Sequence, residues 1–394
     1  MENLVGRTPP TQKIIATQQQ QAVITLSFNN VYSGARVLIT GHTGFKGSWL
    51  SAWLINLGAT VCGYSKDVPT TPSMFGLAGL ASEMEHHTGD IRDLKQLRET
   101  VRTFRPDFIF HLAAQAIVST SYKDPLDTIT SNVTGTANVL EVAREIDWPC
   151  TAVVITSDKC YDNVEWVWGY RETDAVGGKD IYSGSKGAAE LIFRSYYHSF
   201  FHGKDHPVRL ATARAGNVIG GGDWAAYRIV ADCIRAWGDK RTVEIRSPAA
   251  TRPWQHVLEP LSGYLTLAAK LADSDTHDGQ SYNFGPRAEQ NRTVVDLIGD
   301  LGSIWGLQSE TEAYTVTGDI PFHEASLLKL NCDKALLHLN WEANLRYDEC
   351  VDITGSWYRQ VLKEGSNALA VTLEQIASFE ALARDRGRGW TVAG

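Results

Sequence analysis

The stretch TGHTGFKG, residues 40–47, constrains the fold most strongly, because it places three glycines between an apolar strand and a helix. The strand is RVLIT at 36–40, and apolar residues at helical spacing follow from residue 48. Bare backbone at such glycines lets a pyrophosphate approach the amides of a helix N-terminus. Glycines at this spacing are usually turn residues when that context is missing. Here they predict a dinucleotide site whose loop consists of Gly41, His42, Thr43, Gly44, Phe45, Lys46 and Gly47.

The segments that follow alternate between strand-like and helix-like patterns, which is typical of a parallel sheet wound with helices. The predicted strands are 60–64, 108–114 and 152–157, and the predicted helices are 48–58, 93–104, 127–146 and 182–201. The predicted class is α/β, a Rossmann-type doubly wound parallel sheet with a smaller C-terminal substrate-binding lobe. We expect an N-terminal extension at 1–34, a dinucleotide-binding domain at 35–210, and at 211–394 mainly the lobe, with some segments returning to the sheet.

Charge and cysteine usage exclude several classes of function. A net charge of −8 argues against a nucleic-acid partner or an anionic membrane surface, because both require a basic face. The six cysteines form no CxxC pair, so we expect neither a metal site nor a disulfide framework, and a reducing cytoplasm fits best. No stretch approaches the roughly 20 apolar residues of a membrane span.

Chemically useful side chains gather at two further places. The apolar run ending at residue 156 is followed by Ser157, Asp158 and Lys159, an acid and a base side by side at a strand end. Tyr182 and Lys186 are four residues apart at a helix start and share one face. A tyrosine becomes a useful base near neutral pH only if a neighbouring cation stabilises the phenolate. An isolated pair of this kind is usually a surface feature, but after a dinucleotide loop it predicts a catalytic pair.

The choice of cofactor is left open by the second strand. An acidic residue that would hold an adenosine ribose is missing from GYSKD, where Ser65 stands at the strand end and a lysine follows. A lysine tolerates a 2′-phosphate, so both NAD and NADP remain possible on physical grounds. Asp90, in GDIRD, stands where an adenine amino group could be bound, although an aspartate in a loop is more often a turn former.

These motifs together resemble the extended short-chain dehydrogenase/reductases and, among their NAD-dependent nucleotide-sugar dehydratases, the CDP-glucose 4,6-dehydratases. The likeness runs from Arg36 to about residue 360 in GHTGFKGSWL, HLAAQ, SDKCYDN, EWVWGYRE, YSGSKGAAE, RAGNVIGGGDW and RPWQHVLEPLSGY. Related dTDP-glucose dehydratases would carry an acid where Lys159 stands, which favours the CDP branch. Gly184, at the start of the catalytic helix, departs from the pattern.

The resemblance implies a lyase that converts CDP-D-glucose to CDP-4-keto-6-deoxy-D-glucose and water through bound NAD, in deoxysugar biosynthesis of the O-antigen or lipopolysaccharide type. Tyr182 would take the proton of the sugar 4-hydroxyl while NAD takes the C4 hydride. Water would then leave across C5 and C6, and the hydride would return to C6. Ser157 would steer the 4-oxygen, Asp158 would protonate the departing 6-hydroxyl, and Lys159 would act at C5.

The resemblance also implies the remaining binding residues. Besides the glycine loop and the Tyr182/Lys186 pair, the cofactor would meet Ser65, Asp90, Ile91, Leu112, Ala113, Ala114 and Asn132. Asn132 is as well explained as a helix amide bonded to backbone. The diphosphate calls for an arginine of bidentate geometry, for which Arg252 is the first choice. The substrate would meet Gln115, Ser157, Asn217, Arg228, Arg252 and His323.

Two rival interpretations share these motifs. A nucleotide-sugar epimerase or reductase uses the same glycine loop and Tyr/Lys pair, but has no water to expel and little use for Asp158 beside Lys159. A dinucleotide-binding sensor would keep the fold without turnover. Helices 126–146 and 182–201 are the usual dimer faces of the family, so we expect a homodimer or a dimer of dimers.

Overall fold

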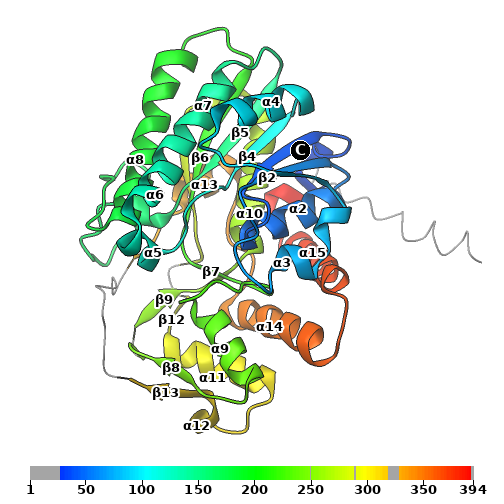
Figure 1. Cartoon of the computed structure of the whole chain (residues 1–394), viewed down its shortest axis with the longest axis vertical. Helices are drawn as coiled ribbons and strands as arrows, with labels where there is room; N and C mark the ends of the chain where they lie inside the picture. Colours follow the sequence, from blue (N-terminus) through cyan, green and yellow to red (C-terminus); the bar gives the residue numbers. More distant parts are fainter. Residues whose placement is uncertain (1–26, 249, 288–289, 318–327, 392–394) are drawn as a thin grey trace, which may run out of the picture.

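The computed structural model describes residues 27–248, 250–287, 290–317 and 328–391 (Figure 1). His323 and the first 26 residues, for which we predicted a substrate contact and a tail, lie outside this part of the chain. A seven-stranded sheet, parallel throughout, has the order β11-β6-β5-β4-β1-β2-β3. The strands are β1 (Arg36–Thr40), β2 (Thr60–Ser65), β3 (Glu85–Thr88), β4 (Phe108–His111), β5 (Cys150–Ile155), β6 (Val208–Ala215) and β11 (Ser281–Phe284).

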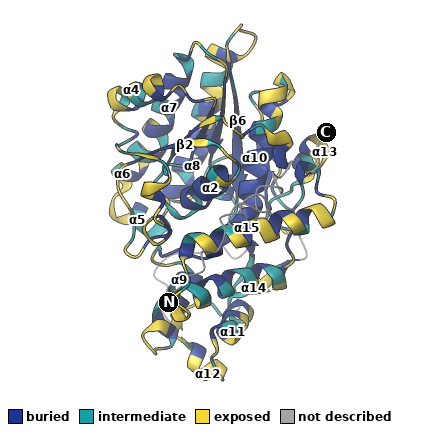
Figure 2. Ribbon diagram, turned by 90° about the vertical axis from the view of Figure 1, so that its right-hand side faces the viewer, coloured by how far each residue is buried: buried dark blue, intermediate teal, exposed yellow. Residues whose placement is uncertain are grey.

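Alternate residues of the central strands enter two separate cores, which is why these strands read as continuous apolar runs. In β1, Val37 and Ile39 join one core and Leu38 joins the other. Figure 2 shows the strands as the most deeply buried layer, between helices whose outer faces are exposed. The strand order reverses between β1 and β4, so the carboxyl ends of these two strands open a crevice where doubly wound sheets bind ligands.

Helices cover both faces of the sheet (Figure 1). One core includes side chains from α4 (Leu94–Phe104), α7 (Gly135–Arg144) and α8 (Ile181–Tyr196). The other includes those of α2 (Phe45–Asn56), α10 (Leu258–Asp273) and α15 (Ala368–Asp385). The remaining short elements of this part are α3 (Met74–Leu77), η2 (Leu80–Ser82), α5 (Val118–Lys123), α6 (Pro125–Ile129), η4 (Asp158–Cys160), η6 (Asp275–His277), α13 (Asp333–Leu339) and η8 (Gly389–Thr391).

The smaller lobe lies at the carboxyl edge of the sheet, in the lower half of Figure 1. Its strands form three two-stranded pairs, β7 with β10, β9 with β12, and β8 with β13. The bounds are β7 (Val218–Ile219), α9 (Ile229–Gly238), β8 (Val243–Ile245), β9 (Thr251–Pro253), β10 (Gln255–His256), β12 (Asn291–Thr293), α11 (Val294–Trp305), α12 (Glu310–Ala313), β13 (Tyr314–Val316) and α14 (Tyr347–Tyr358). No helix in the described ranges is long and apolar enough to cross a membrane.

Several predicted boundaries are wrong. The predicted helix 127–146 is α6 and α7 joined by the π-turn η3 (Thr130–Thr134), and α8 likewise passes into a π-turn, η5 (Tyr197–Phe201). A third π-turn, η7 (Arg359–Lys363), follows α14. Helical periodicity does not signal one extra residue in a turn. Gly184 does not interrupt α8, because the helix runs through it.

The domain limits also shift. The boundary at residue 210 falls inside β6, and β11, α10, α13 and α15 all pack on the body of the sheet. Residues 27–34 are not a tail, because η1 (Ser27–Asn30) leads into a buried segment whose Phe28 and Tyr32 join the core on the α2 side. The Tyr32 hydroxyl donates a hydrogen bond of 2.6 Å to the carbonyl oxygen of Leu265.

Candidate active site

The glycine loop lies at the crevice between β1 and β4. Gly41 has a φ of 80°, and a Cβ there would stand 2.7 Å from the backbone nitrogen of Ala113, which directly follows Leu112 after β4. Gly44 is the N-cap of α2 and makes no side-chain cap, so the first amides of that helix receive no side-chain acceptor from their own cap. This cradle, which a Cβ would fill, fits the pyrophosphate of a dinucleotide.

The second strand end closes one side of the loop. Ser65 Oγ lies 2.8 Å from His42 Nδ1 and also accepts a 3.4 Å hydrogen bond from the amide of Thr43. Burial, followed by the neighbouring His86, lowers the pKa of His42 to about 3, so this imidazole is neutral. The Ser65 hydroxyl therefore helps to hold the glycine loop in place. Its predicted contact with a ribose of the cofactor stays a prediction.

Asp90 already has a strong partner within the chain. Its carboxylate lies 2.6 Å from the guanidinium of Arg92, which also reaches Asp127 at 2.6 Å. The hydrogen bond from Arg92 holds the pKa of Asp90 below its ordinary value, against the opposing effect of burial. Ile91, the next residue, is buried against Gly135 at the start of α7.

The polar residues after β5 form a tight turn. Ser157 is the N-cap of η4, where its Oγ accepts the amide hydrogen of Lys159 at 3.2 Å. The same hydroxyl donates to Asp158 Oδ1 at 2.9 Å. Asp158 is 7% exposed, and burial raises its pKa although Lys159 and the Ser157 hydrogen bond oppose the shift. The turn thus holds a carboxyl group that keeps its proton to a higher pH than an ordinary aspartate does.

Tyr182 and Lys186 both lie in the first turns of α8 and are more than nine-tenths buried. Burial, followed by Asp158, raises the pKa of Tyr182 to about 12, whereas a hydrogen bond with Ser157 and the charge of Arg228 oppose this shift. Burial lowers the pKa of Lys186 to about 8. Arg228 is thus a cation that acts on the phenol, a contribution that the sequence did not indicate.

Asn132 anchors the start of α8. Its side-chain amide donates to Ser185 Oγ at 2.8 Å and to the carbonyl oxygen of Gln115 at 3.1 Å, and its Oδ1 accepts the amide of Gln115 at 2.8 Å. Asn132 therefore bonds backbone and braces the helix, while its contact with the cofactor stays a prediction. The Gln115 side chain donates to Ile117 O and Thr128 Oγ1, so its amide is engaged within the loop after β4. Its substrate contact stays a prediction.

Two adjoining cavities, a larger and a smaller one, open beside Asp158. Both are bordered by Asp158, Pro253 and Leu328. The smaller one is also lined by Lys159, Asn217 and Arg252, three of the residues that the sequence selected. The larger one adds Gly216, Gly285, Pro286, Lys329 and Leu330, which we did not predict. Gly216 stands in the RAGNVIGGGDW stretch, but the sequence assigned none of these five a role, so only the three-dimensional fold identifies them as lining residues.

The loop side of the site carries two more cations. Lys46, on α2, has its pKa lowered to about 8 by burial and then by Arg228, while Asp158 opposes the shift. Arg228 itself lies 3.6 Å from Asp223. These mutual effects place the glycine loop, Arg228 and the end of β5 around one space. The structure therefore brings together Arg228 and the predicted residues of the glycine loop and of the turn after β5. Asp90 lies apart from them, after the edge strand β3.

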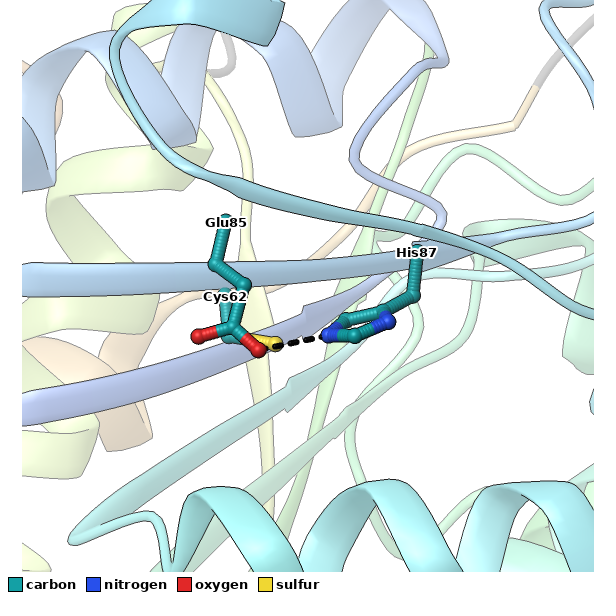
Figure 3. A group of neighbouring side chains, drawn as sticks. All are labelled: Cys62, Glu85 and His87. Atoms are coloured by element: carbon teal, nitrogen blue, oxygen red, sulfur yellow. Dashed lines mark hydrogen bonds and ion pairs between the residues drawn. The ribbon is translucent and has the colours of Figure 1, made fainter.

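One group of potential metal ligands lies away from this site. Cys62 on β2 and Glu85 and His87 on β3 have ligand atoms within 4.8 Å of one another (Figure 3). In the sheet, β2 and β3 are the third and fourth strands from β5. Glu85 and His87 already share a hydrogen bond of 2.6 Å. Burial, followed by Glu85, raises the pKa of Cys62 to about 12, which keeps the thiol protonated and disfavours metal binding.

Known proteins match the chain over most of its length. CDP-glucose 4,6-dehydratase of Salmonella typhimurium is 44% identical over 353 residues, which cover 89% of this chain and 97% of the relative. The structure of dTDP-glucose 4,6-dehydratase from Streptomyces venezuelae, with NAD and TYD bound, superposes with a TM-score of 0.71 at 21% identity, covering 85% of this chain and 99% of that chain.

UDP-glucose 4-epimerase of Thermotoga maritima, solved with UDP-glucose, reaches the same TM-score of 0.71 at 20% identity and covers 83% of this chain and 99% of that chain. The fold alone therefore does not separate dehydratases from epimerases. Residues 38–354 match the family model described as GDP-mannose 4,6 dehydratase. Together with the relative at 44% identity, this match shows that the chain belongs to the GDP-mannose 4,6-dehydratase family of extended short-chain dehydrogenase/reductases, the superfamily that its motifs resembled.

Proposed function

We propose that the chain is an NAD-dependent lyase that converts CDP-D-glucose to CDP-4-keto-6-deoxy-D-glucose and water, in deoxysugar biosynthesis. The cytidine nucleotide rests on the CDP-glucose 4,6-dehydratase relative at 44% identity. The chemistry rests on one observation, the buried acid Asp158 at the same site as the Tyr182/Lys186 pair. A protonated carboxyl is what the departure of a 6-hydroxyl needs.

NAD would be held by the glycine loop, by Ser65 and by the residues after β4. When bound, it supplies a hydride acceptor for C4 and a hydride donor for C6. The close approach of Gly41 to Ala113 and the N-terminus of α2 support this assignment. Lys186, buried one turn after Tyr182, would bind the nicotinamide ribose edge and keep a positive charge near the phenol.

Ser157 and Tyr182 would bind the sugar 4-hydroxyl. Tyr182 accepts its proton, and the hydroxyl of Ser157 orients the oxygen and stabilises the phenolate through the hydrogen bond between the two side chains. Once C4 is a ketone, the proton on C5 becomes acidic. Lys159 would act there, either as the base that takes the C5 proton, or as a cation that stabilises the enolate while Asp158 handles both protons in turn. Asp158 would then give its proton to the 6-hydroxyl, which leaves as water.

Arg252 and Asn217 would bind the diphosphate and the sugar. Both line the cavity that also contains Asp158 and Lys159, so a nucleotide held there would place its hexose at the end of β5. A guanidinium matches phosphate oxygens in bidentate geometry. Arg228 would add charge on the loop side, where it already acts on Tyr182 and Lys46.

Mass spectrometry of products from CDP-, dTDP- and GDP-hexoses tests the proposal. We expect CDP-glucose to lose one water and the other nucleotides to react at least tenfold more slowly. An isomeric product of unchanged mass would identify an epimerase instead. Binding of NAD without any turnover would indicate a sensor.

We also propose a homodimer, or a dimer of dimers, in the cytoplasm. Support for the dimer comes from apolar side chains on α6 and α8 that are exposed in the single chain, such as Leu126 at 71% and Leu191 at 42%. All six cysteines are free thiols, which fits a reducing compartment. Sedimentation velocity would test the dimer, because a concentration-independent monomer contradicts it.

A further inference from the structure

Gln255 is a buried amide beside the site with no function assigned so far. It is the first residue of β10 and follows, after one intervening residue, the strand β9 that contains Arg252. Its side chain is 2% exposed. Neither its Nε2 nor its Oε1 has a hydrogen-bond partner among the described residues. Buried side-chain amides are nearly always bonded, so two unpartnered atoms in one side chain call for an explanation.

Gly216 shows where this amide lies. A Cβ at that position would stand 3.2 Å from Asp158 Oδ2 and 3.9 Å from Gln255 Nε2. The carboxyl of Asp158 and the amide of Gln255 therefore border the same small volume, which a methyl group at residue 216 would occupy. Gly216 also lines the larger cavity together with Asp158, so this volume adjoins the space where the sugar would lie.

Tyr264 adds a third polar group nearby. It lies on α10, is completely buried, and its hydroxyl has no hydrogen-bond partner in the described ranges. Burial, and then the charge of Asp158, raises the pKa of Tyr264, which places the phenol within the electrostatic reach of that carboxyl. A neutral phenol and a neutral amide beside Asp158 offer hydrogen-bonding groups to a small polar molecule and add no charge to the site.

We infer that Gly216, Gln255 and Tyr264 form a recess behind Asp158 that receives the water expelled from C6. This inference rests on the proposed function. In the elimination, the Asp158 proton passes to the 6-oxygen, the C6–O bond breaks, and the enolate electrons form the C5–C6 double bond. The products are the 4-keto-5,6-ene and water, with Asp158 left as a carboxylate, so no further reactant is needed.

The chemistry of an amide suits this role. A water molecule needs both donors and acceptors, and the Gln255 side chain offers two N–H groups and one carbonyl oxygen. Removing the water from the reacting carbons also prevents it from adding back to the double bond. Gln255 thus acts as a positioning residue for the elimination step and takes no part in the oxidation at C4.

Two variants and one control test the recess. Gln255→Met removes both polar atoms at similar volume, and Gly216→Ala fills the recess without replacing any catalytic side chain. Gln375→Met, on α15, is the control, because that buried glutamine also has an unpartnered oxygen among the described residues, while its amide donates to Ile353 O. Rapid-quench mass spectrometry resolves the 4-keto hexose from the dehydrated product.

We expect both recess variants to form the 4-keto hexose at a rate within threefold of the unmodified chain, with KM also within threefold. Their elimination step should be at least tenfold slower, and in deuterium oxide the stalled sugar should take up deuterium at C5. The Gln375→Met control should leave both steps unchanged. Elimination at the normal rate in both recess variants would overturn the inference, and so would an equal slowing of oxidation and elimination. Failure of the unmodified chain to oxidise CDP-glucose would instead refute the proposed function.

Discussion

The proposed elimination depends on the state of a single carboxyl group. Asp158 is buried, and its pKa is raised in spite of Lys159 and Ser157 beside it. A raised pKa means that the acid form, which the elimination requires, persists as the pH rises and is lost only when the pH passes that pKa. We therefore expect the elimination to weaken on the alkaline side, whereas loss of the 4-hydroxyl proton to Tyr182 favours higher pH.

Tyr182→Phe should preserve the fold and nucleotide binding but abolish the oxidation at C4. The ring still fills its buried place in α8, while the proton acceptor is gone. We expect turnover to fall by at least 100-fold, with an unchanged melting temperature and an unchanged Kd for CDP. Near-normal turnover in this variant would refute the catalytic assignment of Tyr182.

Lys159→Met should oxidise C4 and then stall. The change removes the charge beside Asp158 but keeps most of the side-chain volume. We expect reduced cofactor to accumulate on the enzyme and deuterium exchange from solvent at C5 to nearly disappear. Stopped-flow absorbance and NMR measure the two effects. Rapid C5 exchange with continued product formation would show that the proton step does not need this lysine.

Arg252→Ala should chiefly weaken substrate binding. Loss of a charge-assisted diphosphate contact is worth about 2 to 3 kcal/mol, or roughly a 30- to 150-fold rise in KM. Arg292 is a matched control, because it stands opposite Arg252 in the β9–β12 pair and is exposed. Calorimetric titration with CDP checks both variants. Equal affinities of Arg252→Ala and the unmodified chain would remove Arg252 from the site.

At the scale of elements, α8 is held on the sheet by a buried ion pair. Glu190 lies 2.7 Å from Arg214 of β6, and it also accepts hydrogen bonds from Thr156 and Thr212. Although burial raises the pKa of Glu190, the Arg214 charge and these bonds bring it below its ordinary value, so the carboxylate stays ionised. Tyr182 and Lys186 stand on the same helix, so this network fixes the catalytic pair relative to β5.

Glu190→Ala should destabilise the protein by about 3 to 5 kcal/mol, because the Arg214 charge would remain buried without its carboxylate. The double variant Glu190→Ala/Arg214→Met should lose less than the sum of the two single changes. Urea unfolding measures all three free energies. A loss below about 1 kcal/mol in Glu190→Ala would show that the helix does not depend on this pair.

Sequence patterns predicted the type and order of the elements better than their ends. The strands around the crevice followed from apolar runs and from the glycine loop, since both express burial and backbone geometry locally. The π-turns at Thr130–Thr134 and Tyr197–Phe201 were missed, because one extra residue in a turn leaves the apolar pattern almost unchanged. The burial of Phe28 and Tyr32 was missed as well, since nothing local shows that α10 would cover them.

Over the whole molecule, the sequence could not predict which distant residues meet at the site, because they are far apart along the chain. Asp158 follows β5, whereas Gly216 follows β6 and Gln255 opens β10 in the lobe, so only the complete topology brings them together. Motifs selected Lys159, Asn217 and Arg252, which do line one cavity. Gln255 stands in the RPWQHVLEPLSGY stretch but received no role from it, and its importance appears only from its burial and its lack of partners among the described residues.

The arrangement of the body and the lobe around one site makes an internal transfer possible, because the sugar need not leave between the oxidation and the reduction. The most direct test uses CDP-glucose labelled with deuterium at C4, with NMR of the product. The account predicts CDP-4-keto-6-deoxyglucose that has lost one water and carries the deuterium at C6, with no net consumption of NAD. A product of unchanged mass with the deuterium still at C4 would contradict this prediction, and so would the release of deuterium to free cofactor.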